Sequence, residues 1–411
     1  MRLLAFRKHL KFLFTEMRTT MKKNLKRFIS FILITMLTIS LSIPVLAKEV
    51  PTNEKIKVTD EIAIQMAENF AKGAYTELSL SAANPIKLYE STGKAIGYIV
   101  NYYYNSTPYG YVIFDTTGSS LISEYSFGPN AKSPYDIIAS STQSTYSLNN
   151  APLIKTAPFT YGLVDESNGT LTNNYGETES INPSTYSINS DGKDPSSWSD
   201  VFLEIQTIYE NYNLVTTNHL DEFLAFSEDY IEDQTAHYAC AISALYACAA
   251  YYGALNFADV SGDYLGLWEA TGTSVSSTSN GITYGITDVY NVGPGFVSFC
   301  ADKGVTVSQN TVDNPNYRFF TNCIDGGNMA VVHCGIINED DNIRSGHSMA
   351  VQGYATIQSK SSGNQLHTLM VFDGWNEYVR YLNLDFGNWT DLRGTRSEEH
   401  TSELQSLRHL V

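Results

Sequence analysis

The chain has 411 residues and carries 43 acidic against 26 basic side chains, a formal net charge of −17 at neutral pH. This acidic balance argues against nucleic acid or an anionic membrane surface as the partner, because both repel negative charge. The sequence has no glycine-rich phosphate loop, no dinucleotide fingerprint and no Cys-x-x-Cys pair. Nucleotide and zinc sites are therefore not expected, and no organic cofactor or metal is implied.

The N-terminal segment, residues 1–47, reads as a secretory signal. A basic stretch from Met21 to Arg27 precedes an apolar run that ends in Val45-Leu46-Ala47. Those last residues fit the small-x-small cleavage rule, so we expect cleavage after Ala47. Met21 is the expected start of translation. A membrane anchor is the alternative, because the apolar run is near the minimum length that spans a bilayer. The signal predicts a secreted protein with no stable membrane insertion after cleavage.

Residues 48–163 are expected to form a small α+β unit. Thr59 followed by Asp60 and Glu61 predicts a helix N-cap with acidic residues in the first turn. Apolar residues at helical spacing follow it. Strand-like runs come next, at residues 86–89, 95–104, 109–115 and 121–127. A polar turn over 105–110 predicts a hairpin between two of them.

Residues 164–197 are rich in Ser, Asn, Thr, Gly and Asp and poor in apolar residues. This composition predicts an exposed flexible linker. Exposed segments of this kind are where proteolytic cleavage concentrates. Our hypothesis is that the chain is cut within this linker, either by itself or by another protease.

Cys240 lies at the start of a predicted helix. The residues after it are rich in helix formers, and Gly253 suits the position just past the last turn. A thiol at a helix start faces the positive end of the macrodipole, so it is expected to lose its proton near neutral pH. Gln234, six residues upstream, can donate a side-chain N–H to a developing oxyanion. The pair predicts a cysteine nucleophile.

Two strand-like segments downstream carry a candidate base and a candidate orienting residue. One opens on His347, and the other is an apolar run that ends in Asp373 and Trp375. A histidine can accept the proton of a nucleophile, and a carboxylate can hold the imidazole in place. Asn376 is the alternative orienting residue if the strand register is shifted.

The order Gln, Cys, His, Asp-x-Trp over roughly residues 198–395 resembles the papain-like cysteine peptidases, most closely the bacterial streptopain-type and leader-processing branches. The resemblance implies a two-lobed α+β domain, with a helical lobe carrying the Cys and an antiparallel sheet lobe carrying the His. It implies that Cys240 is the nucleophile, His347 the base and Asp373 the orienting residue. It further implies that Gln234 is the oxyanion donor and that Trp375 shields the hydrogen bond of the His.

The chain departs from that family at two positions. Ala241 follows the nucleophile, where papain has Trp and the bacterial branches usually have Gly. Asp373 stands where the family most often has Asn. A helix followed by a strand meander, with the runs Gly110–Asp115 and Glu124–Gly128, resembles more loosely an inhibitory propeptide. This second resemblance implies a zymogen whose own propeptide is a partner in cis and whose substrates are peptides or proteins. A substrate-binding or adhesive module is the alternative.

Each candidate residue also has a structural interpretation. A cysteine in an apolar helix is usually a core residue, and an Asp before Gly can simply cap a turn. His333 beside Cys334 is a rival pair, but adjacent strand residues point to opposite faces. His237 is expected on a loop that lines the cleft. The five cysteines leave one unpaired in a secreted chain, and the other four could form two disulfides or stay reduced.

Two other functions remain open from the sequence. A transglutaminase or wall amidase would use the same Cys-His-Asp chemistry on another acyl group, although Ala241 lacks the Trp that transglutaminases typically have there. A secreted or surface-associated binding protein with an inactive peptidase fold is the non-enzymatic alternative. Intact Gln234, Cys240 and His347 weigh against it.

Residues 396–411 read like the translation of a sequencing adapter, so we expect them to be an artefact without structure. His400 and His409 then carry no function, and the natural chain is expected to continue past about Thr395. Without residues 1–47 and 396–411 the remaining body has 15 basic and 39 acidic residues, a formal net charge of −24.

Overall fold

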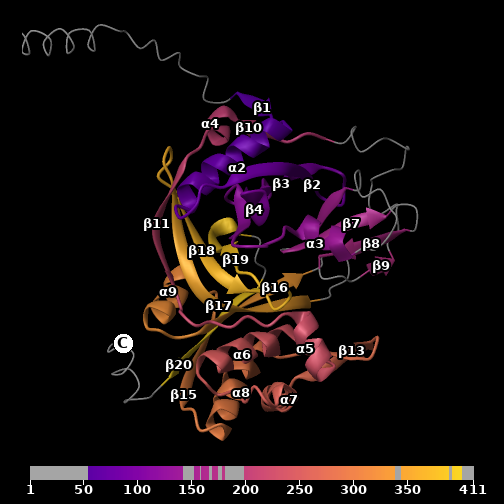
Figure 1. Ribbon diagram of the computed structural model, residues 1–411, viewed down its shortest axis with the longest axis vertical. Helices are drawn as coiled ribbons and strands as arrows, with labels where there is room; N and C mark the ends of the chain where they lie inside the picture. The colour runs from indigo at the N-terminus through magenta and orange to yellow at the C-terminus, as the bar shows by residue number, and fades with distance from the viewer. Residues whose placement is uncertain are drawn as a thin grey trace, which may run out of the picture. The chain divides into compact units, whose positions relative to one another are not determined.

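A large, mostly antiparallel sheet of fifteen strands runs through the described part of the computed structural model (Figure 1). The structure describes residues 54–141, 152–157, 159–165, 169–174, 178–180, 199–337, 344–387 and 391–399. The expected signal and most of the expected linker lie outside these residues. With eight α-helices packed on and around the sheet, the described fold is mixed α+β, as predicted. No helix among the described residues is both long and apolar enough to cross a bilayer.

The N-terminal part begins with β1 (Lys55–Lys57) and α2 (Asp60–Ala74). The predicted N-cap is confirmed, because the Thr59 hydroxyl oxygen accepts the main-chain N–H of Ile62 at 3.4 Å. Helix α2 packs on the strands that follow it. These are β2 (Ser81–Tyr89), β3 (Ala95–Tyr104), β4 (Thr107–Asp115) and β5 (Ile122–Phe127). All four predicted strands and the hairpin turn between β3 and β4 are therefore confirmed.

Further short elements extend into the segment expected to be a linker. They are α3 (Pro134–Ser141), β6 (Leu153–Ala157), β7 (Thr160–Asp165), β8 (Thr170–Asn173) and β9 (Thr178–Ser180). The expectation of an exposed flexible linker over residues 164–197 is thus wrong for β8 and β9. Leu171 is 1% exposed, and the strand ladder satisfies the main chain of this polar segment.

The chain from residue 199 on carries most of the helices. The elements before the central helix are β10 (Phe202–Glu204), α4 (Ile205–Ile208), β11 (Tyr212–His219), α5 (Glu228–Thr235) and β12 (His237–Tyr238). The central helix and its neighbours are α6 (Cys240–Tyr251), α7 (Val260–Ala270), β13 (Ser274–Ser279), β14 (Ile282–Ile286) and α8 (Val289–Asp302). From the sequence alone, residues 201–212 look helical, but only α4 is helical, because β10 pairs with β1 and β11 pairs with β17.

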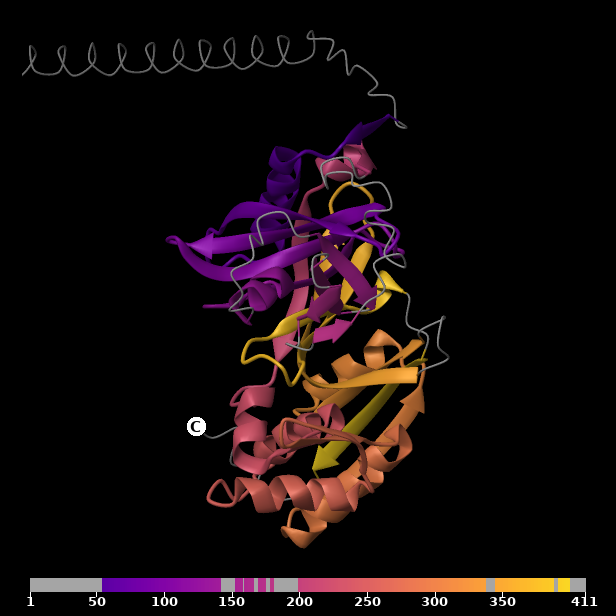
Figure 2. The ribbon, with the colours of Figure 1, turned by 90° about the vertical axis from the view of Figure 1, so that its right-hand side faces the viewer.

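The last elements build the part of the sheet nearest to α6. They are β15 (Val307–Asp313), α9 (Tyr317–Asp325), β16 (Ala330–Ile337), β17 (Arg344–Ser359), β18 (Gln365–Phe372), β19 (Arg380–Asn383), the 3-10 helix η3 (Leu384–Phe386) and β20 (Asp391–Glu399). Helices α5, α6, α7 and α8 gather on one side of β16, β17 and β20 (Figures 1 and 2). Their apolar faces and these strands share one buried core.

The sheet joins the N-terminal strands to the later ones. Fourteen of its strands follow the order β15-β20-β16-β17-β18-β19-β5-β4-β3-β2-β6-β7-β8-β9, and the fifteenth, β11, pairs with β17 off this path. The junction is the antiparallel pair β19–β5, in which Tyr381 is opposite Tyr125 and Leu382 is opposite Glu124. The segment expected to be a separate unit is therefore linked to the rest by strand pairing, and Glu54–Val411 form one compact unit.

Strand β20 includes residues that were expected to have no structure. Arg396 is opposite Asn310 of β15 and Ala330 of β16, and the N–H of Ser397 donates to the Met329 carbonyl at 3.0 Å. The expectation is wrong for Arg396–Glu399, because these residues fill the space between two strands whose main-chain groups need partners. Residues 400–411 lie outside the described part.

Candidate active site

Cys240 is the first residue of α6, as the sequence predicts. Residues 241–249 of this helix are all buried, and Cys240 is half-buried at its N-terminal end. All five cysteines of the chain are described, and all are free thiols. The other four are buried, so Cys240 is the one cysteine within reach of a reagent or a substrate.

The thiol of Cys240 lies against strand β17. Its sulfur is 4.0 Å from the main-chain oxygen of Gly346. Burial raises the pKa of Cys240 above its ordinary value, while hydrogen bonds from Ser348 and from the main chain of Ala241 oppose that rise. The expectation of a thiol that ionises near neutral pH is therefore wrong for this state of the chain. Removal from water outweighs the position at the helix start.

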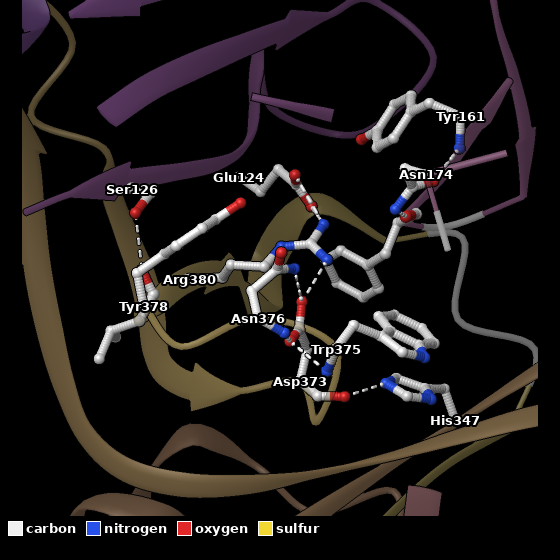
Figure 3. Close-up of polar contacts among 12 residues, drawn as sticks. Glu124, Ser126, Tyr161, Asn174, His347, Asp373, Trp375, Asn376, Tyr378 and Arg380 are labelled. Carbon is white, nitrogen blue, oxygen red and sulfur yellow. Dashed lines mark hydrogen bonds and ion pairs between the residues drawn. The ribbon is translucent and has the colours of Figure 1, made fainter. Parts of the chain in front are cut away.

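His347 lies on β17 with its ring buried. The imidazole stacks on the Trp375 indole with ring centroids 3.6 Å apart and planes 7° apart (Figure 3). Its Nε2 is 2.9 Å from the main-chain oxygen of Asp373. A carbonyl only accepts hydrogen bonds, so Nε2 carries the proton and Nδ1 keeps its lone pair. The imidazole is thereby fixed in the tautomer that can accept a proton at Nδ1.

Burial also sets the charge of this imidazole. It lowers the pKa of His347 to about 4, and the charge and carbonyl of Asp373 oppose that shift. At neutral pH the ring is therefore neutral and available as a base. No hydrogen bond joins the Cys240 sulfur to the His347 ring in the described structure. The two groups lie on neighbouring elements, since α6 packs on β17.

The Asp373 carboxylate does not contact the imidazole. It accepts the main-chain N–H of Trp375 at 2.9 Å and that of Asn376 at 3.0 Å, and the Asn376 side-chain amide at 3.0 Å. Gly374, with φ +80°, allows the chain to fold back over the carboxylate. The prediction that the Asp373 carboxylate orients His347 is therefore wrong. The main-chain oxygen of Asp373 holds the imidazole, and the Asp373 side chain caps a turn. The Asn376 side chain binds Asp373 and is not the orienting group.

A buried ion network, which the sequence analysis missed, holds the same carboxylate. Arg380 of β19 donates from one nitrogen to Asp373 at 2.9 Å and from another to Glu124 of β5 at 2.6 and 2.8 Å (Figure 3). Arg380 is 3% exposed, and both carboxylates are fully buried. Burial raises the pKa of Glu124, and Arg380 opposes that rise, because one guanidinium faces two carboxylates. The only feature of the sequence that could have indicated this network is the lone Arg380 near an apolar strand, because a buried arginine requires a charged partner.

An aromatic residue of the N-terminal part also reaches this network. The guanidinium carbon of Arg380 lies 5.2 Å from the centre of the Phe159 ring. Phe159 is 6% exposed and belongs to the core that contains α6 and Phe372. Glu124 and Phe159 therefore bring two N-terminal segments into contact with the Arg380 guanidinium, which in turn binds the Asp373 carboxylate.

The other predicted site residues lie apart from the thiol. Gln234 is exposed in the last turn of α5, and no hydrogen bond joins it to Cys240 in the part of the chain that the structure describes. Nδ1 of His237 is 2.8 Å from the Thr235 carbonyl oxygen, and its ring packs edge-on against Trp268. The segment before α6 that was expected to be a loop carrying His237 is thus partly helix α5 and strand β12.

His333 lies on β16, opposite Ser348 of β17. Its Nδ1 is 2.8 Å from the Ser348 hydroxyl and its Nε2 is 3.0 Å from the Thr395 hydroxyl. Burial lowers the pKa of His333 to about 3. Its register partner is Ser348, whereas that of Cys334 is His347, so the two members of the rival pair point to opposite faces as expected.

Among the described residues, no group of three or more His, Cys, Asp and Glu side chains is placed to hold a metal ion. What the geometry brings together is a half-buried thiol at a helix start, a neutral imidazole with a fixed tautomer, and a buried charge network behind that imidazole.

Comparison with known proteins found no family model and no curated relative that matches this chain.

Proposed function

We propose that this protein is a secreted cysteine endopeptidase with a papain-like, two-lobed catalytic region, made as a zymogen. The observation that carries the proposal is the pairing of Cys240, at the start of α6, with the neighbouring strand that holds His347 in a base-competent tautomer. The Trp375 ring covers the hydrogen bond of the imidazole, which supports the same assignment. A thiol and an imidazole so placed are the parts that covalent acyl transfer requires.

The mechanism follows from these atoms. Nδ1 of His347 takes the proton of the Cys240 thiol, and the thiolate attacks the carbonyl carbon of a peptide bond. The protonated imidazole then gives that proton to the leaving amine, which leaves an acyl-enzyme. A water molecule, deprotonated by the same imidazole, hydrolyses the thioester and frees the thiol.

The oxyanion of each tetrahedral intermediate needs donors. The main-chain N–H of Cys240 and the exposed side-chain amide of Gln234 are the groups that we propose for this role. Gln234 would have to turn toward the substrate carbonyl when the substrate binds. Loss of one such donor typically lowers kcat by about 10²–10³.

Several features support a latent state of the chain. The pKa of Cys240 is raised and that of His347 is lowered to about 4, both mainly by burial. The N-terminal part adds β5 beside β19, and it places Glu124 on Arg380. We propose that cleavage between β9 and β10 lets the N-terminal part dissociate. Water then reaches Cys240 and His347, and Arg380 keeps Asp373 as its one carboxylate partner.

The test is covalent labelling of the secreted full chain with an epoxide-type cysteine peptidase inactivator, before and after limited proteolysis, read by peptide mass spectrometry. We expect stoichiometric labelling of Cys240 after proteolysis and hydrolysis of an unstructured protein substrate. Both should be lost in Cys240→Ala, and the labelling should be strongly slowed in His347→Ala. Labelling of Cys240 without hydrolysis of any peptide would favour an acyltransferase or amidase. An unreactive Cys240 after proteolysis would overturn the proposal and favour a binding protein.

A further inference from the structure

The residue before the proposed nucleophile, Ala239, is held by one side chain from a neighbouring helix. The Tyr264 hydroxyl of α7 accepts the Ala239 main-chain N–H at 3.0 Å and donates to the Ala239 carbonyl oxygen at 3.2 Å. Ala239 is extended, with φ −150° and ψ 125°, and an extended residue presents its N–H and its C=O to the same side. One hydroxyl can therefore bind both main-chain groups of this residue.

The other contacts of that hydroxyl fix the direction of its proton. The Ser243 hydroxyl of α6 lies 3.1 Å from the Tyr264 oxygen. Because a phenol has one proton and Tyr264 gives it to the Ala239 oxygen, the Ser243 hydroxyl donates to Tyr264. The main-chain N–H of Ser243 donates to the same Ala239 oxygen at 2.9 Å, as the first bond of the helix. Tyr264 and Ser243 are both 0% exposed, so water does not compete for these bonds.

The Ala239 oxygen and the Cys240 N–H belong to one peptide group. That peptide is trans, so its C=O and its N–H point in opposite directions. Since two donors bind the oxygen, the Cys240 N–H is directed to the other side of the peptide. The first N–H groups of a helix have no acceptor within it, and Ala239 has no side-chain oxygen with which to cap α6.

We infer that Tyr264 is a positioning residue that aims the main-chain N–H of Cys240 at the oxyanion. This role rests on the proposed function, in which that N–H stabilises the tetrahedral intermediates. A donor held in place before the reaction stabilises the developing charge without having to reorient. Without the Tyr264 hydroxyl, the Ala239 oxygen keeps only the bond from the Ser243 N–H. The peptide group can then tilt, and the donor is misdirected.

Helix α7 is anchored, so the Tyr264 hydroxyl has a fixed position. Asp263, the residue before Tyr264, is 0% exposed. Its carboxylate pairs with Lys303 at the end of α8 and accepts the main-chain N–H of Asn256. These contacts hold α7 at the residue next to Tyr264, which keeps the hydroxyl against Ala239 rather than letting it follow a moving peptide.

The test compares two reactions of Cys240 in the chain after limited proteolysis. Peptide hydrolysis passes through an oxyanion, whereas in alkylation by iodoacetamide the thiolate displaces iodide from a saturated carbon and no oxyanion forms. In Tyr264→Phe, which keeps the ring and removes the hydroxyl, we expect kcat to fall about tenfold with KM within about twofold of the parent. The rate of Cys240 alkylation, read on its peptide by mass spectrometry, should stay within about twofold of the parent.

Tyr246→Phe is the matched control. Tyr246 of α6 is also 0% exposed, but its hydroxyl has no hydrogen-bond partner among the described residues. Its loss should leave both rates unchanged. A Tyr264→Phe chain that hydrolyses peptides as fast as the parent would overturn the inference. So would an equal loss of hydrolysis and alkylation, because it would mean that the hydroxyl supports the whole site and not the oxyanion donor. A parent that hydrolyses no peptide overturns the proposed function itself, and the role of Tyr264 with it.

Amide hydrogen exchange gives a second measurement that needs neither a variant nor catalysis. In the parent chain, the Ala239 N–H should exchange at least about 10²-fold more slowly than in an unstructured peptide, because the Tyr264 hydroxyl accepts it in the interior. Exchange of the Ala239 N–H at the rate of an unstructured peptide would show that Tyr264 does not hold this residue, and would overturn the inference even if Tyr264→Phe did not fold.

Discussion

The imidazole of His347 donates its Nε2 proton to the main-chain oxygen of Asp373, 2.9 Å away, while the Asp373 carboxylate is bound by Arg380 at 2.9 Å. A main-chain acceptor remains when the side chain is replaced, provided that the turn is kept. Asp373→Asn can still accept the N–H groups of the turn, whereas Asp373→Ala cannot. We therefore expect Asp373→Asn to keep kcat/KM within about tenfold of the parent and Asp373→Ala to lose roughly 10²-fold through misplacement of the imidazole.

Both variants also remove the negative partner of a buried guanidinium. We expect Asp373→Ala to lower the free energy of unfolding by about 3–5 kcal/mol, measured by urea denaturation in a Cys240→Ala background that prevents autolysis. If Asp373→Asn is as inactive as Asp373→Ala yet more stable, the carboxylate itself takes part in the reaction and the main-chain assignment is wrong.

Trp375 keeps the imidazole neutral by covering it. Because burial is the largest cause of the low pKa of His347, loss of the stacked indole in Trp375→Ala should raise that pKa from about 4 toward the ordinary 6.5. The measurement is an NMR titration of the His347 ring in the Cys240→Ala background. Trp268→Ala is the matched control, since Trp268 packs on His237 instead. A His347 titration curve that does not move in Trp375→Ala would contradict this account of the burial.

The Glu124–Arg380 contact should couple the N-terminal strands to the site. Arg380→Met leaves two buried carboxylates without a cation, and we expect it to cost about 3–5 kcal/mol of unfolding free energy. Glu124→Gln should cost less, because Asp373 still neutralises the guanidinium. In a double-mutant cycle the two changes should be clearly non-additive. Arg393→Gln, which breaks a partly exposed pair with Asp313, is the control and should cost at most about 1 kcal/mol. Additive effects at positions 124 and 380 would exclude the coupling.

Two buried histidines should make the fold sensitive to acid. The pKa of His347 is lowered to about 4 and that of His333 to about 3, each mainly by burial. A group whose folded pKa lies below its unfolded value of 6.5 contributes stability that is complete above pH 6.5 and is lost as the pH falls through the folded pKa. Stability should therefore decline from pH 6.5 down to about 3. The raised pKa of Glu124 acts in the opposite sense, adding stability as the pH falls.

The check is urea denaturation at several pH values. In a Cys240→Ala background, His347→Gln should remove about 3 kcal/mol of the loss between pH 6.5 and pH 4, because Gln does not titrate. His219→Gln, at an exposed position in β11, is the control and should leave the pH dependence unchanged. An acid profile that is identical in His347→Gln and the parent would show that His347 is not titrating in this range.

The sequence allowed local features to be predicted well. The Thr59 N-cap, strands β2–β5 and the start of α6 at Cys240 follow from residue preferences within a few positions, and all are confirmed. The expected helix over 201–212 failed because strand pairing with distant segments overrode the local pattern. The strands in the expected linker and at residues 396–399 were missed for the same reason.

The composition of the site could be predicted, but its atomic contacts could not. The sequence singled out Cys240, His347 and Trp375, yet it could not distinguish the carboxylate of Asp373 from its carbonyl. That distinction depends on how Arg380 meets Glu124, a residue 256 positions away. The link between His333 and Ser348 depends on strand register, which no local pattern encodes.

The pairing of β5 with β19 also determines what a cleaved chain would expose. Once β5 has left, β19 becomes the edge of the remaining sheet and presents unpaired N–H and C=O groups, which normally invites other chains to add on. Strand β19 spans only Arg380–Asn383 and carries a cation at its start. Both properties blunt an edge, so a sheet released by the proposed cleavage would be protected against self-association by the same arginine that joins β19 to β5 in the intact chain.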